Sequence, residues 1–428
     1  MDPRNRYLLT RALAAAATLN ALRPVSRFTP HLTTAEFVAG VPVSEMPLQV
    51  AALEGGLALL GAGRGRARGW RGVVGLGLTA VSVAGLWRLH RDAQDSEDVL
   101  ERALVEALGP GYRDAIDEPF SPAPVAPVDR SQILVPRFPR RKRYTARGAN
   151  IAYGDAGRRN TLDVWKRADL PDDARAPVLL QVHGGAWTVG QKEGQAYPLM
   201  SHLAERGWVC VAINYRLSPR ATWPDHIIDV KRAIAWTRAT IAEHGGDPDF
   251  IVLTGGSAGG HLTALAALTP GYEPWQPGFE DADTSVAAAV PFYGVYDFLD
   301  RHGVANPMLE GLLARAVIKT RLAEDRETWD RASPMSNVHA GAPPFFVVHG
   351  ANDTVVPVEQ ARYFVSMLRE VSTSPVVYAE LPRAQHAFDI LPSLRTHHTV
   401  RAVERFLAVV RSRQGGETPA EAVTADAT

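Results

Sequence analysis

Short apolar runs, each bounded by glycine or proline, recur from about residue 144 onward and constrain the fold more than any other feature. They occupy residues 150–154, 161–165, 177–185, 208–215, 250–256, 286–294, 343–350 and 375–382. Near-continuous apolar character is typical of strands that helices cover on both faces of a parallel sheet. Helical periodicity in residues 223–246, 358–371 and 399–413 separates several runs. The alternation predicts an α/β fold with a mostly parallel eight-stranded sheet flanked by helices, in which the first two strands form a hairpin.

The composition argues against nucleic-acid binding, disulfide bonding and metal binding. Lys and Arg together number 46, as do Asp and Glu, so no net charge favours nucleic acid as a partner. Cys210 is the single cysteine and lies within an apolar run, so we expect a buried thiol and no internal disulfide. The 13 histidines form no cluster with the spacing of metal ligands. The composition therefore predicts neither a metal site nor a nucleic-acid partner.

A lone serine lies where one apolar run turns into a helical segment, in "FIVLTGGSAGGHLTALAAL" (residues 250–268). The five residues around Ser257 match G-x-S-x-G, the nucleophile elbow. Glycine at 255 and 259 removes side chains that would collide with the neighbouring strand and helix. A helix N-cap or a phosphate-binding loop would also use such a turn, although the G-K-[ST] of a phosphate loop is absent. The role of Ser257 therefore has to be inferred from other motifs in the sequence.

Three further elements supply what a nucleophilic serine needs. The sequence "HGGAW" (residues 183–187) directly follows an apolar run, where backbone amides of an H-G-G loop can bind an oxyanion. We therefore expect the amides of Gly184, Gly185 and Ala258 to form the oxyanion hole. Asp353 and His386 each follow a later run, in loops at the carboxyl edge of the predicted sheet, where sites form.

The order Ser257, Asp353, His386 is that of the Ser–Asp–His triad on a doubly wound sheet. Asp389 is an alternative acid, but it lies only three residues from the histidine and is poorly placed to orient the ring. The four elements in this order predict a hydrolase.

The motifs "HGGAW", "INYRLSP", "GGSAGG", "HGANDTVVP" and "QHAF" resemble those of the α/β-hydrolase superfamily, and within it the hormone-sensitive-lipase-like and HGGxW carboxylesterases. The resemblance covers residues 144–413 and implies an α/β-hydrolase fold and ester hydrolysis through an acyl-enzyme, without a cofactor. Ala186 stands where the hormone-sensitive-lipase type carries a third glycine. In this respect the motif also resembles kynurenine formamidases, so hydrolysis of an aryl formamide is an alternative. A non-catalytic binding protein on a hydrolase scaffold is a further alternative, disfavoured because both Ser257 and His386 are present.

Residues 294–329 are longer than one crossover helix requires, so we expect part of them to form a lid over the site. The pocket candidates are apolar or aromatic residues of this segment and of the "HGGAW" loop: His183, Trp187, Tyr296, Phe298, Met308, Leu309 and Leu312. A plain helix core is the alternative role for those of residues 294–329. We expect a small-molecule ester or lipid as substrate. The length of its acyl chain and the oligomeric state do not follow from the sequence.

The first 110 residues differ from the rest. Residues 8–22, 47–63 and 72–87 are rich in Ala, Gly and Leu, and residues 93–112 have the pattern of a separate amphipathic helix, capped by Asp95 or Ser96. The basic loop between the second and third segments, together with the basic N-terminus, would lie in the cytoplasm and leave the catalytic domain outside the cell. The extension also resembles that of membrane-associated actinobacterial esterases. A soluble helical lid in a cytoplasmic enzyme is the alternative.

The sequence thus divides into a hydrophobic helical region (1–110), a proline-rich, basic linker (111–143), a catalytic domain (144–413) and a tail (414–428). The tail lacks apolar mass, and we expect it to be disordered.

Overall fold

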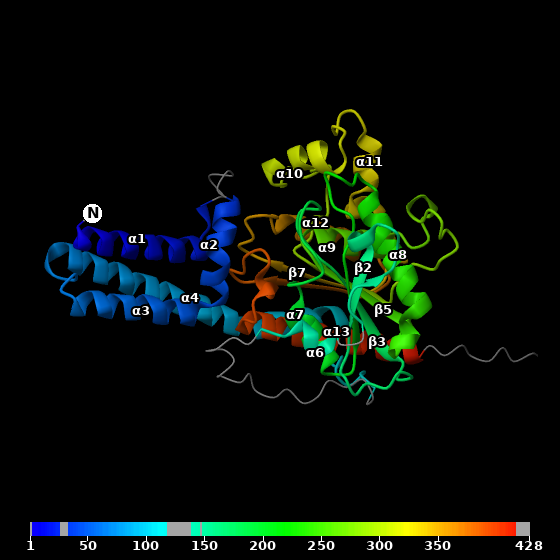
Figure 1. Cartoon of the computed structure of the whole chain (residues 1–428), viewed down its shortest axis with the longest axis horizontal. Coiled ribbons are helices and arrows are strands. Elements are labelled where there is room, and N and C mark those ends of the chain that lie inside the picture. The colour runs from blue at the N-terminus through cyan, green and yellow to red at the C-terminus, as the bar shows by residue number, and fades with distance from the viewer. Residues whose placement is uncertain (1, 26–32, 118–137, 146–147, 417–428) are drawn as a thin grey trace, which may run out of the picture.

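A computed structural model describes residues 2–25, 33–117, 138–145 and 148–416 (Figure 1). The proline-rich part of the predicted linker and most of the predicted tail lie outside these residues. Eight strands form one sheet: β1 (Ile151–Ala152), β2 (Thr161–Trp165), β3 (Ala176–Val182), β4 (Val209–Ile213), β5 (Gly246–Gly256), β6 (Ala288–Phe292), β7 (Phe345–Gly350) and β8 (Val376–Leu381).

The strand order is β1-β2-β4-β3-β5-β6-β7-β8. The β1–β2 and β2–β4 pairs are antiparallel, and every other pair is parallel. The predicted hairpin and the mostly parallel eight-stranded sheet are therefore confirmed. Because β5 lies at the centre between β3 and β6, its carboxyl end brings the serine corner beside the ends of both neighbours.

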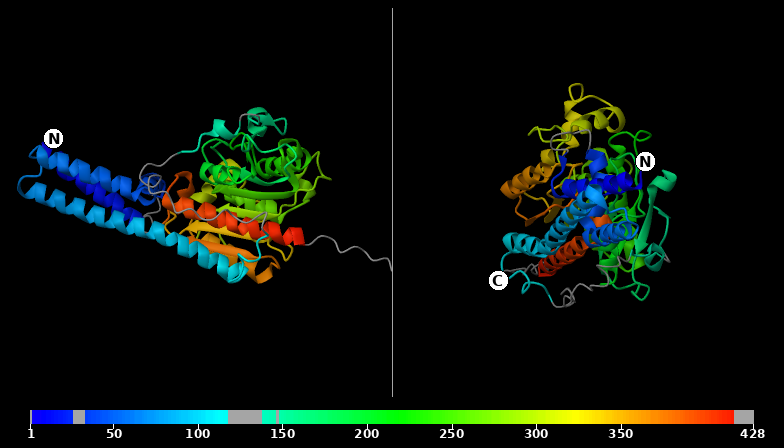
Figure 2. Two further views of the ribbon diagram at one scale, coloured as in Figure 1. Left: turned by 90° about the horizontal axis from the view of Figure 1, so that it is seen from below. Right: turned by 90° about the vertical axis from the view of Figure 1, so that its left-hand side faces the viewer.

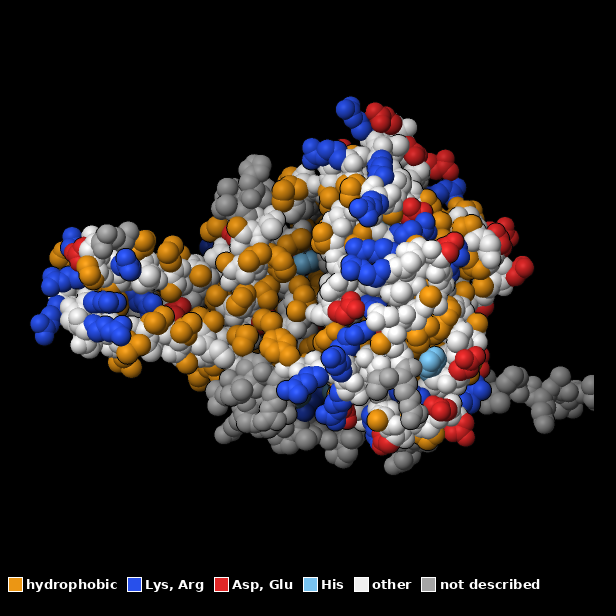
Figure 3. Space-filling view, in the orientation of Figure 1, with side chains coloured by type: hydrophobic (Ala, Val, Ile, Leu, Met, Phe, Trp, Pro, Cys, Tyr) orange, Lys and Arg blue, Asp and Glu red, His pale blue; other side chains and the backbone are white. Residues whose placement is uncertain are grey.

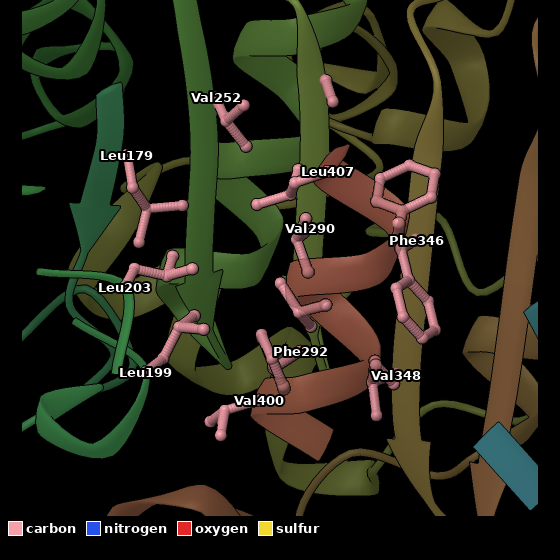
Figure 4. Close-up of a cluster of buried hydrophobic side chains, with 14 of the residues drawn as sticks. Leu179, Leu199, Leu203, Val252, Val290, Phe292, Phe346, Val348, Val400 and Leu407 are labelled. Carbon is pink, nitrogen blue, oxygen red and sulfur yellow. The ribbon is translucent and has the colours of Figure 1, made fainter. Parts of the chain in front are cut away.

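Helices cover both faces of this sheet. This sheet, with its antiparallel β2 and helices on both faces, matches the α/β-hydrolase fold that the resemblance implies. Its helices are α6 (Arg141–Tyr144), α7 (Tyr197–Ala204), α8 (Asp225–Thr240), α9 (Ala258–Leu268), α10 (Pro307–Leu312), α11 (Arg326–Arg331), α12 (Glu359–Val371) and α13 (Leu394–Gly416). Alternate side chains of each central strand point to opposite faces, as Leu179 and Leu180 do on β3. Residues of α7 and α13 share the core of the first face with Leu179 (Figure 4). Helices α8, α9 and α12 pack on the second face.

Four helices precede the hydrolase fold: α1 (Pro3–Leu22), α2 (Thr33–Glu45), α3 (Pro47–Gly63) and α4 (Gly69–Leu108). Helices α1, α3 and the first half of α4 run side by side as an arm that projects from the hydrolase fold, and α2 crosses the base of this arm (Figures 1 and 2). The predicted helical N-terminal extension is thus present.

The prediction of a separate helix at residues 93–112 is wrong. The third apolar segment and the amphipathic segment form one continuous helix of 40 residues, α4. Ser96 does not cap a helix start, since its hydroxyl donates to the Asp92 carbonyl at 2.8 Å, a bond made inside a helix. Leu100 and Leu104 of this helix lie fully buried in the first-face core beside α13. The N-terminal region therefore contributes directly to the packing of the hydrolase fold.

Candidate active site

Ser257 occupies a strained corner between β5 and α9. Its backbone has φ 59° and ψ −121°, a conformation that residues with a side chain rarely adopt. The strand ends at Gly256 and the helix begins at Ala258, so the serine alone forms the corner. The side chain is half-buried and lines a cavity. Among the described residues, no hydrogen bond holds the Ser257 hydroxyl.

Glycine is needed at several positions around the corner because the backbones of β3, β5 and α9 approach one another closely there. A Cβ atom on Gly255 would lie 2.5 Å from the Val182 carbonyl oxygen, and one on Gly259 would lie 2.1 Å from it. A Cβ on Gly184 would lie 3.2 Å from the Cβ of Ser257. Alanine at 255 or 259 would therefore force β3 and the loop after it away from the corner.

Asp353 and His386 are brought together by the ends of β7 and β8. The Nδ1 atom of His386 lies 2.7 Å from Oδ2 of Asp353, and both side chains are buried. The ring of Tyr293 connects this pair to the corner, because it lies 4.7 Å from the imidazole centroid and also borders Gly256, where a Cβ would lie 2.5 Å from its hydroxyl. One aromatic ring therefore contacts His386 and borders Gly256, the residue that precedes Ser257.

The Asp353 carboxylate is held by four donors. Oδ1 accepts from the amides of Val355 and Val356, both at 2.8 Å. Oδ2 faces His386 and also Nε2 of His349, at 3.2 Å. Burial alone would raise the pKa of Asp353, but the two imidazoles lower it to about 2. Asp353 is therefore ionised at neutral pH.

Sequence reasoning missed His349. It is fully buried at the end of β7, and Nε2 lies 2.9 Å from the Val356 carbonyl as well as near Asp353. Its position four residues before the aspartate, at the carboxyl end of a predicted strand, could have indicated that it contacts Asp353.

Asp389, the alternative acid, has a different partner. It accepts a hydrogen bond from the Tyr293 hydroxyl, whereas Nδ1 of His386 faces Asp353. Burial raises the pKa of Asp389 to about 6. This geometry favours Asp353 as the residue that orients the imidazole.

The "HGGAW" loop departs from the predicted oxyanion hole at one position. The Gly184 amide donates to the Gln195 side-chain oxygen at 2.7 Å, so it is not free to bind an oxyanion. The amides of Gly185, Ala186 and Ala258 have no acceptor among the described residues. Gly185 and Ala186 both have positive φ, 125° and 51°, which turns this loop toward the corner. Gln195 is therefore a second residue that the sequence did not indicate, since it lies in a loop without a motif.

Three predicted pocket residues belong to the core instead. His183 is fully buried and stacks on Tyr215 at 4.3 Å, and burial lowers its pKa to about 4. Tyr296 stacks on Phe364 at 4.3 Å, and Phe298 stacks on His261 at 4.5 Å. Each ring packs against an aromatic partner, and the identity of that partner cannot be predicted from residue type or position in the sequence.

The cavity at Ser257 has a volume of about 600 Å³ and mostly apolar walls. Its walls come from the "HGGAW" loop, α10 with the turn after it, and the loop that follows Asp353; they include Ala186, Trp187, Met308, Leu309, Leu312, Val355 and Val356. Residues of the predicted lid, on α10, thus line the cavity at Ser257 (α10 is labelled in Figure 1). Trp187 is fixed in this wall, because its indole N–H donates to His261 at 3.2 Å.

Within the described ranges, no group of three or more His, Cys, Asp or Glu side chains could hold a metal ion. Cys210 is buried on β4, and burial raises the pKa of its thiol. The thiol therefore takes no part in the site.

Comparison with known proteins identifies the family. The model of the BD-FAE family matches residues 162–368. The probable carboxylic ester hydrolase LipM of Mycobacterium tuberculosis is 51% identical over 97% of this chain and 96% of its own. Esterase LipQ of the same organism is 47% identical over 81% and 83% of the two chains.

Among solved structures, butyrate-bound esterase Est2 of Thermogutta terrifontis aligns with a TM-score of 0.53 at 28% identity, over 64% of this chain and 97% of that one. The similarity to LipM includes the N-terminal extension, because that match spans nearly the whole chain. The chain belongs to the family of the mycobacterial carboxylic ester hydrolases, carries a BD-FAE domain on an α/β-hydrolase fold, and is a carboxylesterase.

Proposed function

We propose that this enzyme hydrolyses carboxylic esters through an acyl-enzyme on Ser257, with His386 as the general base and Asp353 as its orienting acid. The observation that carries the proposal is the contact of His386 with an ionised, buried Asp353 beside the strained serine corner. The Asp353 carboxylate fixes the proton of the neutral imidazole on Nδ1, so Nε2 is free to take a proton.

In the first step, Nε2 of His386 removes the Ser257 hydroxyl proton while Oγ attacks the ester carbonyl. His386 then donates that proton to the departing alcohol, and the acyl group stays on the serine. In the second step, His386 takes a proton from water, which attacks the acyl-enzyme. His386 then returns that proton to Oγ of Ser257 as the bond between Oγ and the acyl carbon breaks, and the acid is released. Asp353 stabilises the imidazolium that forms in each step and keeps its own charge.

The amides of Gly185, Ala186 and Ala258 are the proposed donors to the tetrahedral oxyanion. Ala258 is the first residue of α9, so its amide lies at the positive end of the helix dipole. Each donor is expected to contribute about 3 kcal/mol to the transition state. Gln195 supports the hole indirectly, because its hydrogen bond to the Gly184 amide holds the loop in place.

The apolar walls of the cavity favour an uncharged acyl group, and a volume of about 600 Å³ suits a small to medium ester. Purified enzyme should therefore be assayed on p-nitrophenyl esters from acetate to palmitate, with N-formylkynurenine beside them. We expect hydrolysis of the esters and its loss in Ser257→Ala. A clear preference for the formamide would overturn the substrate class, and a Ser257→Ala variant with near wild-type rates would overturn the nucleophile.

We infer further that the arm spans a membrane. Most of its buried positions are polar or small, as in the contact of Arg11 with the Glu54 carbonyl at 2.9 Å and of Thr18 with Ser82 at 2.8 Å. Apart from the basic side chains at its far end, its outer surface is largely apolar, with Leu59 and Val73 exposed by 76% and 69% (Figure 3). A soluble helix bundle has the opposite arrangement, whereas polar contacts inside an apolar exterior suit helices in lipid.

The lengths agree with this inference. Helix α4 is long and apolar enough to cross a membrane, and α2 and α3, bent by 92° at their junction, meet the same criterion together. Helix α1 has 20 residues, or ~30 Å, the thickness of a hydrocarbon core. The N-terminus and the arginine-rich loop of residues 64–68 both lie at the far end of the arm, so the positive-inside rule puts the hydrolase fold outside the cell.

Cysteine labelling tests this topology, because buried Cys210 gives a low background. Single substitutions Arg64→Cys at the far end of the arm and Arg321→Cys on the hydrolase fold are exposed to a membrane-impermeant maleimide on intact cells. We expect the second variant to be labelled and the first to be protected until the cells are lysed. Labelling of Arg64→Cys alone would contradict the orientation, and recovery of the protein in the soluble fraction would contradict the anchor.

A further inference from the structure

Helix α2, at the base of the arm, lies directly on the catalytic loops. The ring of Phe37 meets the His386 imidazole edge to face, with centroids 5.6 Å apart and planes at 78°. Phe37 is half-buried, whereas its neighbour Val38 is 65% exposed and points away. The extension therefore supplies one side of the environment of the catalytic histidine.

The loop that carries Asp353 is tied to the extension on both sides of the aspartate. The preceding residue, Asn352, donates from its side-chain amide to the carbonyls of Ala21 at 2.9 Å and Leu22 at 3.2 Å, at the end of α1. The following residue, Thr354, donates from its hydroxyl to the Thr33 carbonyl at 3.1 Å, where α2 begins. The aspartate thus lies between two consecutive anchors to the N-terminal helices.

Gln385 joins this loop to the histidine loop beneath α2. Its side-chain oxygen accepts from the amide of Thr354 at 2.9 Å and from the amide of His386 at 2.8 Å. Gly40 of α2 packs on the same side chain, since a Cβ placed there would lie 3.5 Å from its amide nitrogen. One glutamine thus sets the spacing of the two catalytic loops, and α2 covers it.

The end of α2 is fixed to the segment that follows His386. Glu45 forms a fully buried ion pair with Arg395 and accepts from the Ser393 hydroxyl at 2.9 Å. A buried pair of this kind requires both partners, so it holds the helix firmly in one place.

We propose that α2 is a positioning element of the active site, in which Phe37 is the positioning residue for His386. The inference rests on the proposed triad. The N-terminal extension then does more than anchor the enzyme: it completes the active site within the same chain, because it holds the Asp353 and His386 loops at the spacing that Ser257 requires. Turnover therefore depends on the packing of the extension as well as on the hydrolase fold.

The test compares Phe37→Ala with Phe37→Leu and the matched control Val38→Ala, all in the full-length protein. The kcat and KM for p-nitrophenyl butyrate, the thermal midpoint and the rate of phosphonylation of Ser257 by a fluorophosphonate are measured for each. A misplaced general base impairs the proton transfer from Ser257 and not the binding of the ester. We therefore expect Phe37→Ala to lower kcat ~10-fold with little change in KM. Phosphonylation should slow in parallel. Phe37→Leu, which keeps the apolar cover, should recover most of the loss, and Val38→Ala should match the wild type.

A kcat for Phe37→Ala within about twofold of wild type overturns the proposal, and so does an increase in KM alone, which would make Phe37 a pocket wall. An equal loss in Val38→Ala also overturns it. If Phe37→Ala fails to fold, Thr354→Val removes the hydroxyl contacts with the Thr33 carbonyl and the Gln385 side-chain oxygen, which tie the Asp353 loop to α2 and to the histidine loop. An unchanged kcat in that variant also overturns the proposal. Ser257→Ala separates the two proposals, because activity in that variant contradicts the triad whatever the result at Phe37.

Discussion

Replacement of Asp353 by asparagine tests the proposed pairing of base and acid. In the enzyme, Oδ1 accepts from two backbone amides, of Val355 and Val356, while Oδ2 faces His386 at 2.7 Å and His349 at 3.2 Å. An asparagine that keeps its oxygen on the amides must turn its NH₂ group toward both imidazoles. Nδ1 of His386 then has to accept a hydrogen bond, so the proton of the neutral ring moves to Nε2. The ring nitrogen that should take the serine proton is then already protonated.

We expect Asp353→Asn to lower kcat on the order of 10⁴-fold, as in other triads with the wrong tautomer. Such a loss corresponds to about 5.5 kcal/mol in the barrier. The matched control is Asp389→Asn, which replaces the other carboxylate near His386 and keeps an acceptor for Tyr293. Both variants are assayed on p-nitrophenyl butyrate, and thermal midpoints establish that each is folded. Activity above a tenth of wild type in Asp353→Asn, or an equal loss in Asp389→Asn, would refute the assignment.

Three further predictions follow from the site. The low pKa of Asp353, about 2 against an ordinary value of 3.8, stabilises the fold by ~2 kcal/mol above pH 4. Because the folded pKa is depressed, this contribution is lost as the pH falls from 4 to 2, and urea unfolding of wild type and Asp353→Asn should converge there. Gln195→Ala leaves the Gly184 amide without its acceptor, so we expect a loss of about 1–3 kcal/mol in unfolding free energy and a reduced kcat, whereas Gln195→Glu, which keeps the acceptor, should fold normally. Leu312→Trp fills part of the cavity, so activity on long acyl esters should fall more than activity on acetate, and a uniform loss would argue against this acyl site.

The sheet and the serine corner could be predicted because each depends on local sequence. Apolar runs and glycines act through backbone geometry close to them in the chain, as the clearance at Gly255 and Gly259 illustrates. The order of the strands then brings Asp353 and His386 together at one edge, and the loop positions of these residues were visible in the sequence.

Two of the residues that sequence reasoning missed, Gln195 and Phe37, act through contacts that no local pattern indicates, whereas His349 lies only four residues from Asp353. Gln195 meets Gly184 across 11 residues, and Phe37 meets His386 across the whole hydrolase fold. Neither lies in a motif, and the role of each is set by tertiary packing. The continuity of α4 was missed for a related reason: the apolar and amphipathic halves face different surroundings, one on the arm and one on the core, so their patterns differ although the helix does not end.

The most direct measurement of the central claim is the site of covalent modification. Enzyme treated with a fluorophosphonate is digested, and the adduct is located by mass spectrometry while residual esterase activity is followed. The triad predicts one adduct per chain, on Ser257, formed in proportion to the loss of activity and abolished in Ser257→Ala. An adduct on another residue, or full ester hydrolysis by enzyme whose Ser257 is completely modified, would contradict the account.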